Sequence, residues 1–411
     1  MEAVKKQLTK NSIQRYQKYK DSGIEWLGEI PEHWELKRFK HLFKEKKITH
    51  NIELNSGSIS FGKVVYKDDE KIPLATKKSY QVLNKGEFLI NPLNLNYDLI
   101  SLRIALSDKD VVVSSGYIIV QNAIEISKSY FKWLLHIFDI AYMKTLGSGV
   151  RQTLSFTHIA NSELVFPSLQ EQTAIATFLD DKTQKIEEAI AIKEQQIVLL
   201  KERKQILIHK AVTRGLDDTV PLKDSGVDWI GEIPEHWEVK ALKFICYLQS
   251  GDFISSDDFK EEGYPVFGGN GFRAYSNNYT NEGFYALIGR QGALCGNVNY
   301  ARGKFYATEH AVVVYPLNNE DVLWLGETIK QANFNRLSQS AAQPGIAVGV
   351  IKNEVFPYPS STEQKEIASY IISITNKTEE IISLKQEEIE KLKEYKSSLI
   401  NSVVTGKVNV C

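Results

Sequence analysis

Residues 21–40 read DSGIEWLGEIPEHWELKRFK, and residues 224–243 read DSGVDWIGEIPEHWEVKALK. Fourteen of the twenty positions are identical, and four of the other six exchange only aliphatic or acidic residues. Such a match within one chain indicates two copies of one structural unit. A duplicated unit predicts a protein with an approximate twofold axis and two similar surfaces.

A second repeat follows each copy of the first. Residues 171–176 read EQTAIA, and residues 363–368, 192 positions later, read EQKEIA. The correspondence continues without a gap to residues 212–213 and 404–405, which both read VT. Residues 41–165 and 244–355 lie between the repeats and look unrelated to each other. The chain therefore consists of a short motif, a variable segment and a conserved helix, followed by the same three parts again.

The composition predicts two folded modules. The 411 residues are too many for one ordinary domain, and 43% of them are apolar against 25% charged. The longest apolar stretch, residues 131–143, is interrupted by Lys132, His136 and Asp139, and the polar N-terminus lacks the apolar segment of a signal peptide. We therefore expect a cytoplasmic protein with no membrane partner.

Charge and cysteine content exclude other classes. A net charge of -1 argues against a protein that coats nucleic acid through charge alone, although residues 36–47 form a locally basic run. A solvated helix face explains such a run equally well. Three widely separated cysteines offer neither a disulfide framework nor the spacing of zinc ligands.

Two long helices are predicted to begin near residues 171 and 363. Apolar residues recur there at steps of three, four and seven, which is the spacing of a coiled-coil seam. The seam positions are Ile190, Ile197, Leu200 and Leu207 in the first copy and Ile382, Ile389, Leu392 and Leu399 in the second. Forty helical residues extend roughly 60 Å. Because each helix has one apolar stripe, antiparallel pairing buries both stripes and places the two modules at opposite ends.

Polar residues interrupt the two seams at matching positions. These positions are Thr183 and Thr375, Lys193 and Lys385, and Lys204 and Lys396. Such residues can fix the register of a coiled coil at a cost in stability. Alternatively, the lysines simply extend their ammonium groups to solvent.

The GEIPEHWE motif is predicted to be structural. Its glycine and proline fix a turn, and its tryptophan anchors the turn in a core. Neither His33 nor His236 has a second histidine one helical turn away, so a metal or acid–base site is not indicated. We expect each motif to tie its module to the helix pair.

The order of these parts closely resembles the specificity subunit of type I restriction-modification systems, over essentially the whole chain. In that family the variable segments are target recognition domains, each of which reads one half of a split double-stranded DNA site. The conserved helices pack antiparallel and hold two adenine methyltransferase subunits. The resemblance implies a non-catalytic DNA-binding chain, whose methyltransferase and restriction/translocase partners bring S-adenosylmethionine, ATP and magnesium.

The repeats and the resemblance together predict an α+β fold. Two mixed α/β recognition domains are separated by a long antiparallel two-helix coiled coil, with a pseudo-twofold internal repeat. The predicted boundaries are 1–165 for the first recognition domain, 166–215 for the central helix, 216–355 for the second recognition domain and 356–411 for the C-terminal helix.

Candidate DNA-contacting residues are polar side chains on short loops, because hydrogen bonds to base edges carry sequence information. In the second variable segment, glycine-flanked turns carry Asn270, Arg273, Arg290 and Gln291. Arg290 is expected to pair with guanine or a phosphate, Gln291 with adenine, and Arg302 and Lys304 with the DNA backbone. The GRQG stretch at residues 289–292 and residues 306–310 also resemble segments of the family's recognition domains.

In the first variable segment, strands are predicted at residues 87–90, 100–106, 111–113 and 117–120. Polar residues of this segment are further candidates. They are Asn91, Asn94, Arg103, Ser114, Ser115 and Tyr117, together with Arg151 in the flexible turn at residues 147–152.

The sequence carries no recognisable catalytic motif. Residues 91–94 read NPLN and do not match the NPP[YF] loop of adenine methyltransferases, and no phosphate-binding loop of the form GxxxxGK[ST] is found. Two alternatives stay open. One is a nuclease with its own recognition domains that uses Asp68, Asp69, Glu70 and Lys71 around a metal. The other is a coiled-coil adaptor that binds protein instead of DNA.

Overall fold

The computed structural model describes residues 14–93, 102–145, 154–292, 294–337 and 345–411. The chain forms two compact units: residues 1–192 with 388–411 make up unit 1, and residues 193–387 make up unit 2. Each unit therefore contains one globular module, one segment of the first long helix and one segment of the second. The predicted domain boundaries treat each long helix as a separate segment, whereas this division splits both helices between the two units. The predicted boundaries stay a prediction.

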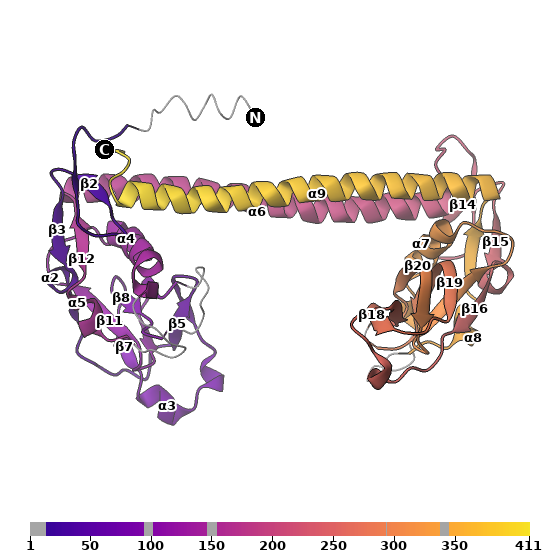
Figure 1. Ribbon diagram of the computed structural model, residues 1–411, viewed down its shortest axis with the longest axis horizontal. Coiled ribbons are helices and arrows are strands. Elements are labelled where there is room, and N and C mark those ends of the chain that lie inside the picture. The colour runs from indigo at the N-terminus through magenta and orange to yellow at the C-terminus, as the bar shows by residue number, and fades with distance from the viewer. Residues whose placement is uncertain (1–13, 94–101, 146–153, 293, 338–344) are drawn as a thin grey trace. The chain divides into compact units, whose positions relative to one another are not determined.

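Unit 1 is built around an antiparallel sheet in the order β4-β11-β8-β9, of which Figure 1 labels β8 and β11. The helix α4 covers this sheet, and its N-terminus is capped by the Ser127 side chain, which accepts from the Tyr130 amide. Small antiparallel pairs complete the unit: β1 with β2, β3 with β12, β5 with β6 and β7 with β10. Its strands are β1 (Tyr19–Asp21), β2 (Glu29–Pro31), β3 (Glu35–Arg38), β4 (Phe43–Glu45), β5 (Gly57–Ser60), β6 (Lys63–Tyr66), β7 (Gln81–Leu83), β8 (Phe88–Ile90), β9 (Ile104–Leu106), β10 (Val111–Val113), β11 (Ile118–Asn122) and β12 (Glu163–Phe166). Its shorter helices are α2 (Phe39–Leu42), α3 (Leu74–Lys78), α4 (Lys128–Ala141), α5 (Phe156–Ala160), η1 (Asp69–Lys71) and η2 (Met143–Thr145).

Unit 2 has a larger sheet in the order β16-β21-β19-β20-β17-β18, in which only the β17–β20 pairing is parallel. The helix α7 packs on β19 and β20, and Asp321 caps its first turn. Two small pairs flank the sheet: β13 with β14 and β15 with β22. Its strands are β13 (Leu222–Asp224), β14 (Glu232–Pro234), β15 (Glu238–Ala241), β16 (Cys246–Ser250), β17 (Tyr264–Gly268), β18 (Gly271–Ser276), β19 (Asn281–Gly289), β20 (Val298–Ala307), β21 (Ala311–Pro316) and β22 (Val355–Tyr358). Its shorter helices are α7 (Val322–Gln331), α8 (Val348–Ile351), η3 (Leu242–Phe244), η4 (Ser256–Asp258) and η5 (Phe334–Leu337).

The long helices α6 (Leu169–Arg214) and α9 (Ser361–Val404) run antiparallel in each unit. In unit 1, Lys396 of α9 pairs with Glu187 of α6, and in unit 2, Lys204 of α6 pairs with Glu379 of α9 at 3.6 Å. These two ion pairs are related by the same offset of 192 residues as the sequence repeat. The predicted antiparallel pairing and the α+β fold class are confirmed.

The seam is buried where the apolar spacing predicted it. All eight predicted seam residues are buried or half-buried, whereas Ile192, Leu199 and Ile206 on another stripe of α6 are exposed. Two of the seam lysines, Lys204 and Lys396, do not simply extend to solvent. Their ammonium groups pair with a glutamate of the other helix, which favours this register.

Among the described residues, no helix has both the length and the apolar character that a membrane crossing requires. The strands predicted in the first variable segment correspond to β8, β9, β10 and β11. The bounds of β10 are as predicted, and the ends of the other three differ from the prediction by at most four residues.

Candidate nucleic-acid interface

A buried tryptophan joins the module of unit 1 to the long helices. Trp34 is fully buried, and its Nε1 donates a 3.1 Å hydrogen bond to Oε1 of Glu171 in the first turn of α6. Nε2 of His33 lies 2.8 Å from the same oxygen. The other carboxylate oxygen accepts from the amide and the hydroxyl of Ser168, and the Ser168 hydroxyl in turn accepts from the Glu171 amide. Ser168 and Glu171 thus form a capping box that also holds the GEIPEHWE motif.

Unit 2 repeats this junction atom for atom. Trp237 donates a 2.8 Å hydrogen bond to Oε1 of Glu363, His236 lies 2.9 Å from that oxygen, and Ser360 completes the capping box. Burial alone would raise the pKa of Glu363, but the hydrogen bonds from Trp237, Ser360 and His236 outweigh it and lower the pKa to about 2. The predicted structural role of both histidines is confirmed.

A glutamine next to each capping glutamate attaches the module's own helix. Gln172 accepts from the Ser127 amide at the start of α4 and donates to the Pro167 carbonyl. Gln364 makes the same two bonds, to the Asp321 amide at the start of α7 and to the Pro359 carbonyl. The glutamate and glutamine of each sequence repeat therefore attach a dissimilar module to its long helix in the same way.

Four chain segments meet at one end of the unit 2 sheet. We call residues 250–253, 268–271, 289–292 and 308–310 the loop cluster. The Arg290 amide donates to the His310 carbonyl, and its Nη1 donates a 3.1 Å hydrogen bond to the Ser250 hydroxyl. A Cβ on Gly289 would overlap the carbonyl oxygen of Gly269, so only glycine permits this approach of two backbones.

The loop cluster contains three of the predicted DNA contacts. Asn270 and Gln291 are exposed, and Arg290 is half-buried because of its bond to Ser250. Among the described residues, the Asn270 side chain accepts only a long 3.4 Å bond from Asn297, so most of its hydrogen-bonding capacity is left unused within this part of the chain. The glycine-rich turns that the sequence suggested as separate loops thus form one surface.

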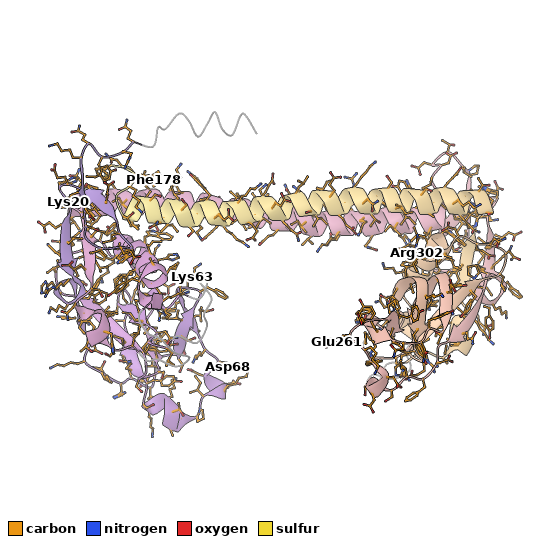
Figure 2. All side chains as sticks on the ribbon, viewed as in Figure 1. Lys20, Lys63, Asp68, Phe178, Glu261 and Arg302 are labelled. Carbon is orange, nitrogen blue, oxygen red and sulfur yellow. The ribbon has the colours of Figure 1, made fainter. Side chains whose placement is uncertain are left out.

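Arg302 and Lys304 lie apart from this surface. The β19–β20 register places them beside Phe284 and Glu282, whereas Arg290 follows the far end of β19. Arg302 stacks over the Phe284 ring at 4.6 Å, and Lys304 lies 4.0 Å from Glu282, whose charge raises the pKa of the lysine. Figure 2 shows Arg302 near the helix pair and Glu261 at the opposite end of the module. Arg273 is exposed and lies over the Phe259 ring at 5.5 Å.

Three candidates of unit 1, Asn91, Arg103 and Tyr117, lie side by side at the ends of neighbouring strands. The pairings of Ile90 with Ile118 and with Ile104 place Asn91 between Tyr117 and Arg103. The Asn91 side chain caps its own turn by accepting from the Leu93 amide. Tyr117 is half-buried, and burial raises the pKa of its phenol. Ser114 turns the chain between β10 and β11, and its carbonyl accepts from Gln81, while Ser115 is exposed.

Arg103 is corrected by the structure. Its side chain is only 4% exposed, and its Nε donates a 2.8 Å hydrogen bond to the fully buried carboxylate of Asp139 in α4. A buried ion pair of this kind holds the sheet and the helix together and is not available to DNA. Asn94 and Arg151 lie outside the described residues.

Residues 31–197 and 234–391 match the type I restriction modification DNA specificity domain. The chain belongs to this family. It is 40% identical to the type I restriction enzyme EcoprrI specificity subunit of Escherichia coli over 154 residues, which span 36% of this chain and 38% of that protein. It is 25% identical to the MjaVIII specificity subunit of Methanocaldococcus jannaschii over 357 residues, which span 80% of this chain and 77% of that protein.

Solved structures share the fold. A chain from a structure of type I R-M complex assembly and conformational transition has a TM-score of 0.71 at 14% identity, covering 91% of this chain and 98% of that chain. The HsdS subunit from Thermoanaerobacter tengcongensis has a TM-score of 0.56 at 16% identity, covering 92% of this chain and 98% of that chain. At these identities the likeness concerns the fold alone.

The acidic residues that were considered for a nuclease site make structural contacts within unit 1. Asp68 caps η1 and pairs with Lys71, while Asp69 accepts from the Ser56 amide and pairs with Lys77 at 2.8 Å. The hydrogen bond from Lys77 lowers the pKa of Asp69. Within the described ranges, no group of three or more histidine, cysteine, aspartate or glutamate side chains could hold a metal.

Two features were missed from the sequence. The serines of the capping boxes could have been found, because Ser168 and Ser360 each stand three residues before a glutamate. Phe253, in the loop cluster, could not be found by the same reasoning. Its side chain is 77% exposed, and a phenylalanine followed by Ile254 in an otherwise polar stretch carries no signal of exposure.

Proposed function

We propose that this chain supplies the DNA sequence specificity of a type I restriction-modification enzyme, and that each unit reads one half of a bipartite double-stranded site. The observation that carries the proposal is the pair of matching junctions. The Trp34–Glu171 and Trp237–Glu363 bonds are the same, yet they support two unlike sheets. Two identical junctions that carry two different DNA-binding surfaces suit a DNA site with two unlike halves.

We further propose that the helix pair sets the gap between the half-sites and docks two methyltransferase subunits. A stiff helix pair suits the first role, because its length changes by a fixed amount per residue. The apolar residues that the seam leaves exposed support the second. In the unit 2 segment these include Leu199, Ile206, Ile381 and Leu384.

In this scheme the chain recognises DNA, and catalysis belongs to its partners. Asn270 and Gln291 read base edges, while Arg273, Arg302 and Lys304 contact phosphates. The methyltransferase and restriction/translocase subunits bind S-adenosylmethionine, ATP and magnesium. A protein that acts on chromosomal DNA in this way works in the cytoplasm.

The test is co-expression of the chain with its cognate methyltransferase, followed by genome-wide mapping of methylated adenines. We expect one motif with two specified halves and a fixed unspecified gap. A continuous motif, or a methylation pattern that does not depend on this chain, contradicts the proposal. The two alternatives have separate readouts: cleavage of DNA by the isolated chain with magnesium supports a nuclease, and absence of salt-sensitive duplex binding supports a protein adaptor.

A further inference from the structure

Phe253 is a large apolar side chain on a backbone that is firmly held. The Asp252 amide donates a 3.0 Å hydrogen bond to the Ala307 carbonyl, and the Tyr306 hydroxyl donates a 2.9 Å bond to the carbonyl of Phe253 itself. Asp252 also forms a bridge with Thr308. The 77% exposure of the ring is therefore set by the fold of the loop cluster.

Phe253 lies among the polar residues that are proposed above to contact DNA bases. Three residues before it, Ser250 bonds to Arg290, which is followed by the exposed Gln291. The turn that carries Asn270 packs against the same backbone, because a Cβ on Gly269 would lie 3.0 Å from the His310 carbonyl oxygen. An exposed phenylalanine among amides that can form hydrogen bonds matches a surface that reads both polar and apolar features of bases.

The charges of the loop cluster indicate which groove of DNA it faces. Asp252 is exposed, so the cluster carries a carboxylate acceptor beside its amides. The major groove presents amino donors of cytosine and adenine, whereas the narrower minor groove presents only the guanine amino group. Carboxylates are also disfavoured in a narrow minor groove, because the negative potential is stronger there. The major groove is therefore the favoured partner, and its apolar feature is the C5-methyl group of thymine.

We propose that Phe253 is a specificity residue that contacts the C5-methyl group of a thymine in the half-site read by unit 2. The proposal deepens the proposed function and rests on it. It adds an apolar contact to the polar ones and assigns an A·T pair to the position that Phe253 faces.

The test is a thymine-to-deoxyuridine scan of the mapped site, with binding of the full chain and its methyltransferase partner measured on each duplex. We expect one deoxyuridine in one half-site to weaken wild-type binding about fourfold, the ratio expected for burial of one methyl group. The Phe253→Ala variant binds the unmodified site more weakly and is indifferent to that deoxyuridine. Its thermal unfolding midpoint stays unchanged, because the ring makes little contact with the fold.

Phe244 provides the matched control. It is 63% exposed in the same unit, but it lies before β16, and Phe253 lies after that strand. The Phe244→Ala variant is expected to keep the wild-type affinity and the full deoxyuridine penalty.

Three results overturn the contact. One is a Phe253→Ala variant that retains the deoxyuridine penalty, and another is a wild-type protein that is insensitive to deoxyuridine throughout both half-sites. The third is a Phe253→Ala variant that no longer binds the methyltransferase when DNA is absent. This result would show that the ring contacts protein. Failure of the proposed function is distinguishable, because the wild-type complex would then give no bipartite methylation pattern at all.

Discussion

Gly406, which follows α9, packs directly against the buried Trp34: a Cβ atom on Gly406 would lie 2.8 Å from Cζ3 of the indole ring, and closer still to the ring of Pro31. The backbone of Gly406 also has a φ angle of +76°, which residues other than glycine rarely adopt. Trp34 thus contacts the start of α6 through Glu171 and the end of α9 through Gly406. Gly215 and Trp237 repeat this contact in unit 2 at 3.2 Å.

A Gly406→Ala substitution is expected to destabilise unit 1. The left-handed backbone and the overlap with Trp34 together should lower the free energy of unfolding by about 2–4 kcal/mol. Gly23→Ala is the matched control, because Gly23 has φ +68° in the same unit but nothing within 4 Å of its Cβ position. Urea unfolding followed by tryptophan fluorescence measures both. Equal losses in the two variants would show that only backbone strain matters, and that the packing of Gly406 against Pro31 and Trp34 does not.

The Glu363 carboxylate predicts a loss of stability in acid. Folding lowers its pKa from 4.5 to about 2, so its contribution is complete above pH 4.5 and is lost as the pH falls towards 2. The Glu363→Gln variant should be less stable at neutral pH, by about 3 kcal/mol at most, and should show a shallower decline between these pH values. Urea unfolding at a series of pH values measures both quantities. An unchanged acid decline would show that the capping box contributes nothing to it.

The junctions and helices were predictable because their signals are local or repeated. The seam shows itself through spacing along one helix, and the GEIPEHWE motif through its second copy. The candidate DNA-contacting residues were only partly predictable, because residue type does not reveal burial. Arg103 finds its partner Asp139 36 residues away, in a helix that the sequence showed only as an apolar stretch. Phe253 is exposed because β20 holds its loop, which is equally invisible in the sequence.

The Arg103–Asp139 pair should be needed for stability and not for sequence recognition. Asp139→Ala leaves a buried guanidinium without its partner and is expected to cost about 3–5 kcal/mol. The double variant Arg103→Met with Asp139→Leu should recover most of this loss, because apolar residues of similar size need no charge partner. Chemical unfolding measures stability, and methylation mapping should show an unchanged motif for the double variant. A changed half-site would restore Arg103 as a reading residue.

Gln291 and Lys304 should affect DNA binding in different ways. Gln291→Ala is expected to relax the motif at one base pair of one half-site, with a loss of discrimination of about 1–3 kcal/mol. Lys304→Ala should weaken binding to all sequences alike and lower the salt dependence by about one charge. Binding titrations on matched and mismatched duplexes at several salt concentrations separate the two effects. A sequence-dependent effect of Lys304→Ala would place this lysine at a base edge.

Lengthening the helix pair should change the gap and leave both half-sites intact. Seven residues inserted between Ile190 and Ala191 in α6, and seven between Leu392 and Lys393 in α9, preserve the seam and the ion pair of Lys396 with Glu187. The added heptad lengthens the helix pair by about 10 Å, which corresponds to about 3 base pairs of DNA. Methylation mapping should therefore return the same half-sites with a longer gap. An insertion in α6 alone is the control, because it shifts α6 against α9, breaks the register of the ion pairs and should abolish methylation. An unchanged gap in the double insertion would rule out the helix pair as the element that sets the spacing.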